Sequence, residues 1–172
     1  MERFTTGGPW ESLYGYARAV KAGPWIVTAG CTATVQGDVR CVGDPAGQTK
    51  EAFRIALDAI VDAGASVGDV VRTRMYITDP MHADAVGRAH GELFGVVKPA
   101  ATVVVTKLLH PEQLVQVEVE AYHVPDFPDE GDGLERRAEA SVSADLPTWM
   151  VAEGMSGDGL SALADPLPEG LL

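Results

Sequence analysis

Residues 115–122 alternate between two kinds of side chain, and this pattern constrains the fold more than any other part of the chain. Valine takes almost every second position, while Gln116, Glu118 and Glu120 stand between. Successive side chains of a β-strand point to opposite faces, so the valines share one face and the carboxylates the other. The valine-rich residues 101–105 predict a second strand just before it. The chain therefore builds a sheet with one apolar and one polar face.

A sheet face that carries Glu118 and Glu120 has two interpretations. Many antiparallel sheets pack one face on the core and leave the other in solvent, so a wet surface is one reading. The other reading is a pocket at a boundary between subunits, where partners offset the cost of removing carboxylates from water. The remaining segments bear on this choice.

The rest of the chain mixes strand and helix periodicities. Strands are expected at residues 16–21, 25–28, 32–35, 39–42 and 70–77, and helices at residues 45–63 and 81–94. An Asp-Pro pair precedes each helix and supplies a capping side chain followed by a proline suited to the first turn. Gly64 is placed to end the first helix. Helices of this length between strands predict crossovers, and hence an α/β fold whose mixed sheet has two helices on one face.

Side-chain periodicity assigns residues to the two sheet faces. The first helix presents an apolar stripe formed by Phe53, Ala56, Leu57, Ile60 and Val61. Strand 70–77 presents Val71, Thr73, Met75 and Ile77 to the helices. The opposite face collects Tyr16, Arg18, Arg72, Arg74, Tyr76, Glu118 and Glu120. This set is too polar for a dry core, and it favours burial in an oligomer with pockets between subunits.

Negative charge is concentrated at the C-terminal end. The net charge is −12, and residues 125–172 hold eleven acidic residues against two arginines, which accounts for −9 of it. We expect residues 1–124 to form one domain and residues 125–172 an acidic extension. That extension is either dispensable or held on the oligomer by the apolar segment around Trp149. The chain shows no basic patch, so no nucleic-acid partner is expected.

The chain carries no signal for a membrane. No stretch approaches eighteen apolar residues, and the N-terminus lacks a basic and then apolar leader. The two cysteines, Cys31 and Cys41, fit a reducing compartment, with one disulfide as the alternative. These features predict a cytoplasmic protein that is not bound to membranes.

Several short motifs occur in the order found in one protein family. They are Tyr16 before Ala19-Val20, IVTAG at 26–30, Gln48-Thr49 at a helix start, AGAS at 63–66 with DVVR at 69–72, Phe94, Pro99-Ala100 and VEVEA at 117–121. Residues 14–123 thereby resemble the RidA/YjgF family (Rid proteins). The resemblance implies a chorismate-mutase-like α/β fold, a homotrimer and active sites in the clefts between subunits. Archetypal members hydrolyse reactive enamines and imines to ketoacids and ammonia, with no metal or other cofactor.

The chain departs from this family at the substrate anchor. Deaminating members carry an arginine after the Pro-Ala pair, where this chain has Ala101. A guanidinium grips a carboxylate by two directional hydrogen bonds that a small side chain cannot supply. Val103 stands where a cysteine is usual, and Ala29 where a serine is usual. The resemblance therefore implies a specialised substrate rather than a generic amino-acid-derived imine.

Three family positions are retained, at Tyr16, Gly30 and Glu118. Glu118 matches the carboxylate that positions or activates water, a role that suits a glutamate whose pKa is raised by burial. We assign Glu118 and Tyr16 as catalytic candidates. Backbone groups near Gly30 and at Ala101 and Thr102 are expected to orient the ligand.

Three further side chains are candidates for substrate binding. Arg18, on the face of Tyr16, and Arg74 can reach an anionic substrate, with ion pairs on the surface or between subunits as their alternative use. Cys31 follows Gly30 and either touches the ligand or is a small buried residue. The four histidines show no metal-ligand spacing.

Two functions are compatible with these residues. The first is an enzyme that acts on an imine, enamine or related intermediate, by deamination or by a derived proton transfer, condensation or cyclisation. The second is a non-catalytic trimer that binds a metabolite or a partner protein.

Overall fold

The computed structural model describes residues 1–124 of the 172-residue chain. The predicted acidic extension at 125–172, including Trp149, lies outside the described residues. The strands are β1 (Glu2–Phe4), β2 (Ala19–Ala22), β3 (Trp25–Thr28), β4 (Cys31–Thr32), β5 (Thr34–Val35), β6 (Asp38–Val39), β7 (Val70–Ile77), β8 (Ala100–Val105) and β9 (Val115–Tyr122). The helices are α1 (Pro9–Tyr14), α2 (Pro45–Asp62) and α3 (Ala83–Phe94), with 3-10 turns η1 (Val67–Asp69) and η2 (Pro80–His82).

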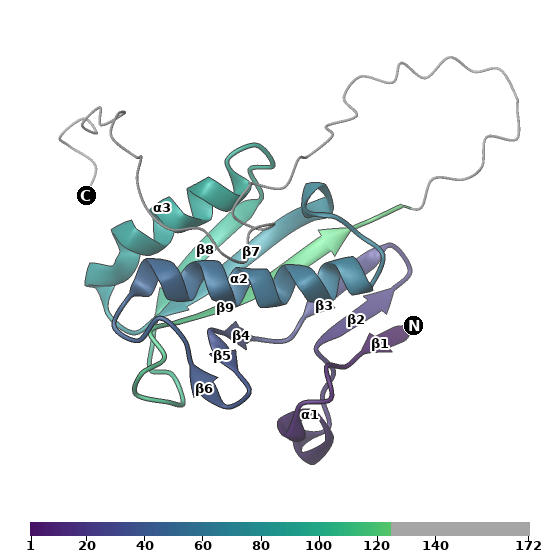
Figure 1. Cartoon of the computed structure of the whole chain (residues 1–172). Helices are drawn as coiled ribbons and strands as arrows, with labels where there is room; N and C mark the ends of the chain where they lie inside the picture. Colours follow the sequence, from purple (N-terminus) through teal and green to yellow (C-terminus); the bar gives the residue numbers. More distant parts are fainter. Residues whose placement is uncertain (125–172) are drawn as a thin grey trace, which may run out of the picture.

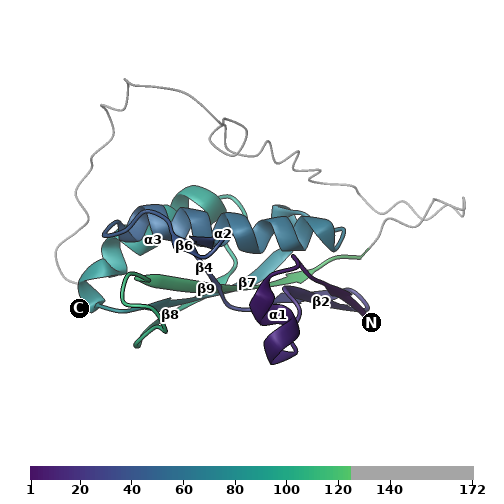
Figure 2. The same ribbon diagram turned by 60° about the horizontal axis from the view of Figure 1, so that its bottom comes forward.

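One seven-stranded sheet organises this part of the chain. Its order is β1-β2-β3-β9-β7-β8, and β4 also pairs with β9. Strands β7 and β8 are parallel and are joined through α3, while the other pairs in this sheet are antiparallel. Helices α2 and α3 lie together on one side of the sheet, and α1 lies away from them near β1 and β2 (Figures 1 and 2). The predicted mixed sheet with two helices on one face is confirmed.

The core fills the space between the sheet and helices α2 and α3. Its fully buried large side chains include Ile26, Phe53, Ile60, Ile77, Val86, Phe94, Val115, Val117 and Val119. Helix α2 begins as predicted, because the Asp44 side chain accepts a hydrogen bond from the Gly47 amide. A side chain at Gly47 would collide with the Asp44 carboxylate, so glycine is needed there. Gly64 follows α2 with a φ of 87°, which fits its predicted place just after the helix.

Two residues expected in the core are exposed instead. Val61 is 57% exposed, so the apolar stripe of α2 ends at Ile60. Val71 is 39% exposed, while its neighbour Val70 is 3% exposed. A register shift between Val70 and Arg72 explains the second error, because a bulge displaces the alternation at the start of β7.

Several predicted boundaries also differ. The second helix does not begin at Met81, because Asp79 caps the Met81 amide at 2.8 Å and forms the 3-10 turn η2 before α3. The strand expected at 16–21 begins only at Ala19, since the Tyr16 amide bonds to the carbonyl of Glu11 on α1. The expected hairpin at 32–35 and 39–42 shrinks to β5 and β6. Strand β1 and helix α1 were not predicted from the sequence.

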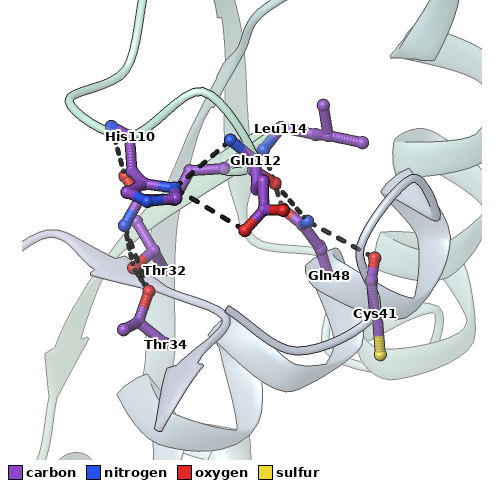
Figure 3. A network of polar contacts seen from close by, with 8 residues as sticks. Thr32, Thr34, Cys41, Gln48, His110, Glu112 and Leu114 are labelled. Atoms are coloured by element: carbon purple, nitrogen blue, oxygen red, sulfur yellow. Dashed lines mark hydrogen bonds and ion pairs between the residues drawn. The ribbon is translucent and has the colours of Figure 1, made fainter. Parts of the chain in front are cut away.

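A buried glutamine fixes the loop that leads into β9. Gln48 Nε2 donates to the carbonyl of Glu112 at 2.7 Å and to that of Cys41 at 3.4 Å, and its Oε1 accepts from the Leu114 amide at 2.7 Å (Figure 3). Gln48 is fully buried, so an unmade hydrogen bond there would be costly. The start of β9 is thus anchored to α2.

Candidate functional site

The uncovered face of the sheet gathers the predicted polar residues. On β9 these are Gln116, Glu118 and Glu120, and on β7 they are Arg72, Arg74 and Tyr76. The strand register pairs Arg72 with Glu120, Arg74 with Glu118 and Tyr76 with Gln116. All six are of intermediate exposure. The alternation read from the sequence therefore places these side chains together.

Glu118 lies at the centre of this polar group. Arg74 Nη1 is 2.7 Å from Glu120 Oε1 but 3.4 Å from Glu118 Oε2. The hydrogen bond and charge of Glu120 are the main reasons why the pKa of Arg74 is raised. Burial raises the pKa of Tyr76, and the charge of Glu118 and a hydrogen bond to it add to this effect. Arg74 is thus committed mainly to Glu120, which leaves Glu118 the less engaged carboxylate.

A second polar group, formed by residues between 16 and 31, lies next to strand β9. Arg18 Nη1 lies 3.3 Å from the carbonyl of Gly30 and 3.6 Å from Cys31 Sγ. Strand β4 pairs Cys31 with Val117 and Thr32 with Gln116, and the Gln116 side chain reaches back to Gly30. A Cβ on Gly30 would lie 2.5 Å from Gln116 Nε2, so the absence of a side chain there makes room for Gln116.

Cys31 is a buried thiol at the edge of this second group. Burial raises the pKa of Cys31, and the nearby Arg18 opposes that shift only in part. Cys31 Sγ lies 3.4 Å from the carbonyl of Ala29 and donates to it. Cys31 and Cys41 are both free. The protonated thiol is suited to packing rather than to nucleophilic attack.

Tyr16 lies beside Arg18. Its ring centroid is 5.9 Å from Arg18 Cζ, and its side chain is exposed. A shallow depression beside it is lined by Tyr16, Val20, Val27, Thr28, Ala29 and residues of the N-terminal segment, Glu11 among them. The structure therefore brings Tyr16, Arg18 and Gly30 together next to the polar face of β9.

Ala101 and Thr102 lie apart from this group within one chain. Thr102 pairs with Arg74 across the parallel β7–β8 ladder and so shares the polar face. Ala101 pairs with Thr73, whose hydroxyl contacts His90 on α3, and so faces the helix side of the sheet. Strands β7 and β9 separate both residues from Arg18.

One polar residue beside the site was missed from the sequence. Glu11 on α1 is 5% exposed, and its Oε1 lies 3.5 Å from Arg18 Nε. The sequence offered only an indirect signal, since Pro9 after two glycines fits the first turn of a helix. The contact itself depends on how α1 folds back onto β2.

Residues 1–124 contain neither a metal-binding cluster nor a membrane-spanning helix. No group of three or more His, Cys, Asp or Glu side chains there could hold a metal ion. No helix in this described part is long and apolar enough to cross a membrane.

Comparison with known proteins gives consistent matches over this region. The family model described as Endoribonuclease L-PSP matches residues 9–124. An uncharacterized protein of Streptomyces coelicolor is 44% identical over 123 residues, which covers 71% of this chain and 92% of the relative. A protein named 3-aminoacrylate deaminase RutC, from Acinetobacter baylyi, is 27% identical over 106 residues, covering 61% and 84%.

A solved structure supports the same fold. A member of the YjgF/YER057c/UK114 family from Mycobacterium tuberculosis is 40% identical and gives a TM-score of 0.63. The match covers 70% of this chain and 98% of that one.

Proposed function

This chain belongs to the RidA/YjgF family, whose model carries the description Endoribonuclease L-PSP, and from that membership we propose that it is an enzyme acting on an imine, enamine or related reactive intermediate. The relative named 3-aminoacrylate deaminase supports chemistry of this kind. We do not propose RNA cleavage. The chain has a net charge of −12 and shows no basic patch, so no nucleic-acid partner is predicted.

The proposal rests on the partial burial of Glu118 and on its weak pairing with Arg74. Its carboxylate is half-buried on the uncovered face, and Arg74 approaches it less closely than it approaches Glu120. In hydrolysis of an imine, water adds to the carbon of the C=N bond and gives up a proton to Glu118. Glu118 returns that proton to the nitrogen, which gives a carbinolamine. Transfer of the carbinolamine hydroxyl proton to the nitrogen, relayed by the same carboxylate, then lets the C–N bond break as the C=O bond forms, and a carbonyl compound and ammonia leave. A positioned carboxylate suits such proton transfer.

The residues around Glu118 support a specialised substrate. Tyr16 and the backbone at Gly30 would orient the ligand from one side, with Thr102 and Arg74 across the face. The side chain of Ala101 has no group that could hold a carboxylate, and it lies on the helix side of the sheet. Substrate recognition in this chain therefore needs a different anchor from the family arginine.

We also propose that copies of the chain assemble as a homotrimer with the site at the subunit boundary. All six residues of β8 are exposed although this strand is rich in valine, and within residues 1–124 no helix covers the polar face of β7 and β9, because α1 lies near β2 (Figure 2). An uncovered apolar edge strand favours burial against another chain. Light scattering that showed a monomer would refute this part of the proposal.

Hydrolysis of freshly generated 2-iminopropionate tests the activity. Ammonia release above the buffer rate that is lost in the Glu118→Ala variant would support deamination. The matched control is Glu92→Ala, since Glu92 forms an exposed ion pair with Lys50 on the helix layer. No acceleration by the wild-type protein would refute deamination of this substrate.

A non-catalytic binding protein is the second candidate. The observation in its favour is that Arg74 bridges Glu118 and Glu120, which partly neutralises the carboxylate required for catalysis. Native mass spectrometry of the purified protein tests it. A retained metabolite, together with no turnover of imines, would support binding over catalysis.

A further inference from the structure

Glu11 is a buried carboxylate to which the proposed chemistry assigns no task. It accepts hydrogen bonds from the Thr6 amide at 2.9 Å, the Thr6 hydroxyl at 2.8 Å and the Gly7 amide at 3.2 Å. These hydrogen bonds stabilise the negative charge of Glu11 and fix the position of its carboxylate. Glu11 is thus a buried, hydrogen-bonded acid on a short helix whose residues 10 and 12–14 are exposed.

Glu11 also touches both candidate residues that follow α1. Its Oε1 lies 3.5 Å from Arg18 Nε, and its backbone carbonyl accepts from the Tyr16 amide at 3.1 Å. The two ligand-orienting candidates on this side of the site are therefore placed by one residue. Displacement of Glu11 would move both of them.

Neighbouring groups contact the guanidinium of Arg18, but they do not use all of its N–H donors. Its Nη1 faces the Gly30 carbonyl at 3.3 Å and Cys31 Sγ at 3.6 Å, and its Nη2 has no partner among residues 1–124. Charge-assisted N–H bonds to oxygen are usually about 2.7–2.9 Å long, so the 3.3 Å contact with the Gly30 carbonyl is loose. Arg74 differs, because it makes a 2.7 Å contact with Glu120. Arg18 therefore retains donors for an incoming anion, and its ion pair with Glu11 restricts where the guanidinium lies, which lowers the entropy cost of binding.

The position of Arg18 relative to Glu118 follows from the strand register. Arg18 contacts Gly30, and a side chain on Gly30 would meet Gln116. Gln116 and Glu118 share one face of β9, and same-face neighbours on a strand are about 7 Å apart. A small molecule held by Arg18 would therefore lie within reach of Glu118.

We propose that Glu11 is a positioning residue that presents Arg18 to the carboxylate of a small organic acid bound beside Glu118. The inference deepens the proposed function by naming the anchor that stands in for the missing arginine at Ala101. It rests on that function for the chemistry, but anion binding can be measured without any turnover.

Calorimetric titration of the full chain with pyruvate tests the binding step. Pyruvate supplies a carboxylate beside a carbonyl, and methyl pyruvate supplies the same skeleton without the charge. We expect pyruvate to bind, methyl pyruvate to fail, and Arg18→Gln to weaken pyruvate binding by tenfold or more, as about 1.4 kcal/mol or more of lost interaction implies. Arg18→Lys, which keeps the charge but loses the planar fork, is expected to weaken binding as well.

A double-mutant cycle tests the role of Glu11. Glu11→Gln alone should weaken pyruvate binding several-fold, and in the Arg18→Gln background it should change nothing further. Glu92→Gln is the control on the helix layer and should bind like wild type. If Glu11→Gln fails to fold, the comparison of Arg18→Lys with Arg18→Gln and wild type still tests the anchor.

The outcomes separate this inference from the proposed function. Pyruvate binding that depends on Arg18, without imine hydrolysis, would support the anchor and refute the enzyme. Pyruvate binding that is equal in wild type and Arg18→Gln, equal binding of methyl pyruvate, or no binding of pyruvate would overturn the anchor. Additive effects of the two substitutions would overturn the positioning role of Glu11.

Discussion

Strands β7 and β9 build two unlike surfaces from the same sixteen residues. Toward the helices they present buried Thr73, Met75, Val117 and Val119, and away from them the partly exposed Arg74, Glu118 and their neighbours. The covered face stabilises the fold by removing apolar surface from water. The uncovered face leaves charged groups only partly paired, so these groups remain able to contact a ligand. Alternation along a strand thus separates the buried core side chains from the candidate site within a few ångströms.

The largest expected effect comes from the covered face. Phe53 on α2 is fully buried, and its ring lies 5.0 Å from that of Phe94. Phe53→Ala should lower the free energy of unfolding by about 3–5 kcal/mol, because it removes buried surface and leaves a cavity. Urea denaturation at fixed protein concentration measures this loss. Val27→Ala, on the uncovered face, is the control and should change stability by about 1 kcal/mol or less.

The contrast between the faces would fail if these two variants lost similar stability. In that case the uncovered face would be packed as tightly as the covered one, and the partner layer would have to carry a large share of the folding free energy.

A smaller effect is expected from the polar contact on the covered face. His90 Nε2 lies 2.9 Å from the Thr73 hydroxyl, and its ring packs against Phe53 and Phe94. Burial lowers the pKa of His90 below its ordinary value of 6.5. As the pH falls below 6.5, the unfolded chain therefore takes up a proton that the folded chain resists, and stability decreases.

Urea denaturation at several pH values from 7 to 5 measures this dependence. A variant without a titratable group at position 90 provides the reference. His90→Gln keeps a group able to bond Thr73, so it should show a shallower loss of stability over that range than wild type. His110→Gln is the control, because His110 lies on an exposed loop and should leave the slope unchanged. Equal slopes in wild type and His90→Gln would show that His90 carries no part of the acid sensitivity.

The parts of the fold that rest on local signals could be predicted from the sequence. The Asp44-Pro45 pair and Gly64 bound α2, and alternation alone placed Arg74, Glu118 and Glu120 on one face. Both signals depend only on neighbours in the chain. The bulge at Val70 was hidden, because it depends on how β7 pairs with β9 rather than on the residues of β7.

The candidate site was only half predictable for the same reason. Glu11 meets Arg18 because α1 folds back on the sheet, and Gly30 meets Gln116 across a pairing of distant segments. Neither contact has a periodic signature in the sequence. Tyr76 and Gln116 were assigned to the polar face by alternation, but their closeness to Glu118 and Gly30 required the register.

The smallest expected change in stability is on the uncovered face, and it sharpens the comparison most. Glu120→Gln removes the shorter partner of Arg74 from a pair that is open to solvent, and exposed ion pairs contribute little to stability. The urea midpoint should therefore stay close to that of wild type. Arg74 is then free to turn to Glu118, which now lies 3.4 Å away. The resulting tighter pair would occupy the oxygen that Glu118 needs for water, so imine hydrolysis should slow several-fold. Loss of stability comparable to that of Phe53→Ala, with hydrolysis unchanged, would show that this face serves the fold rather than the reaction.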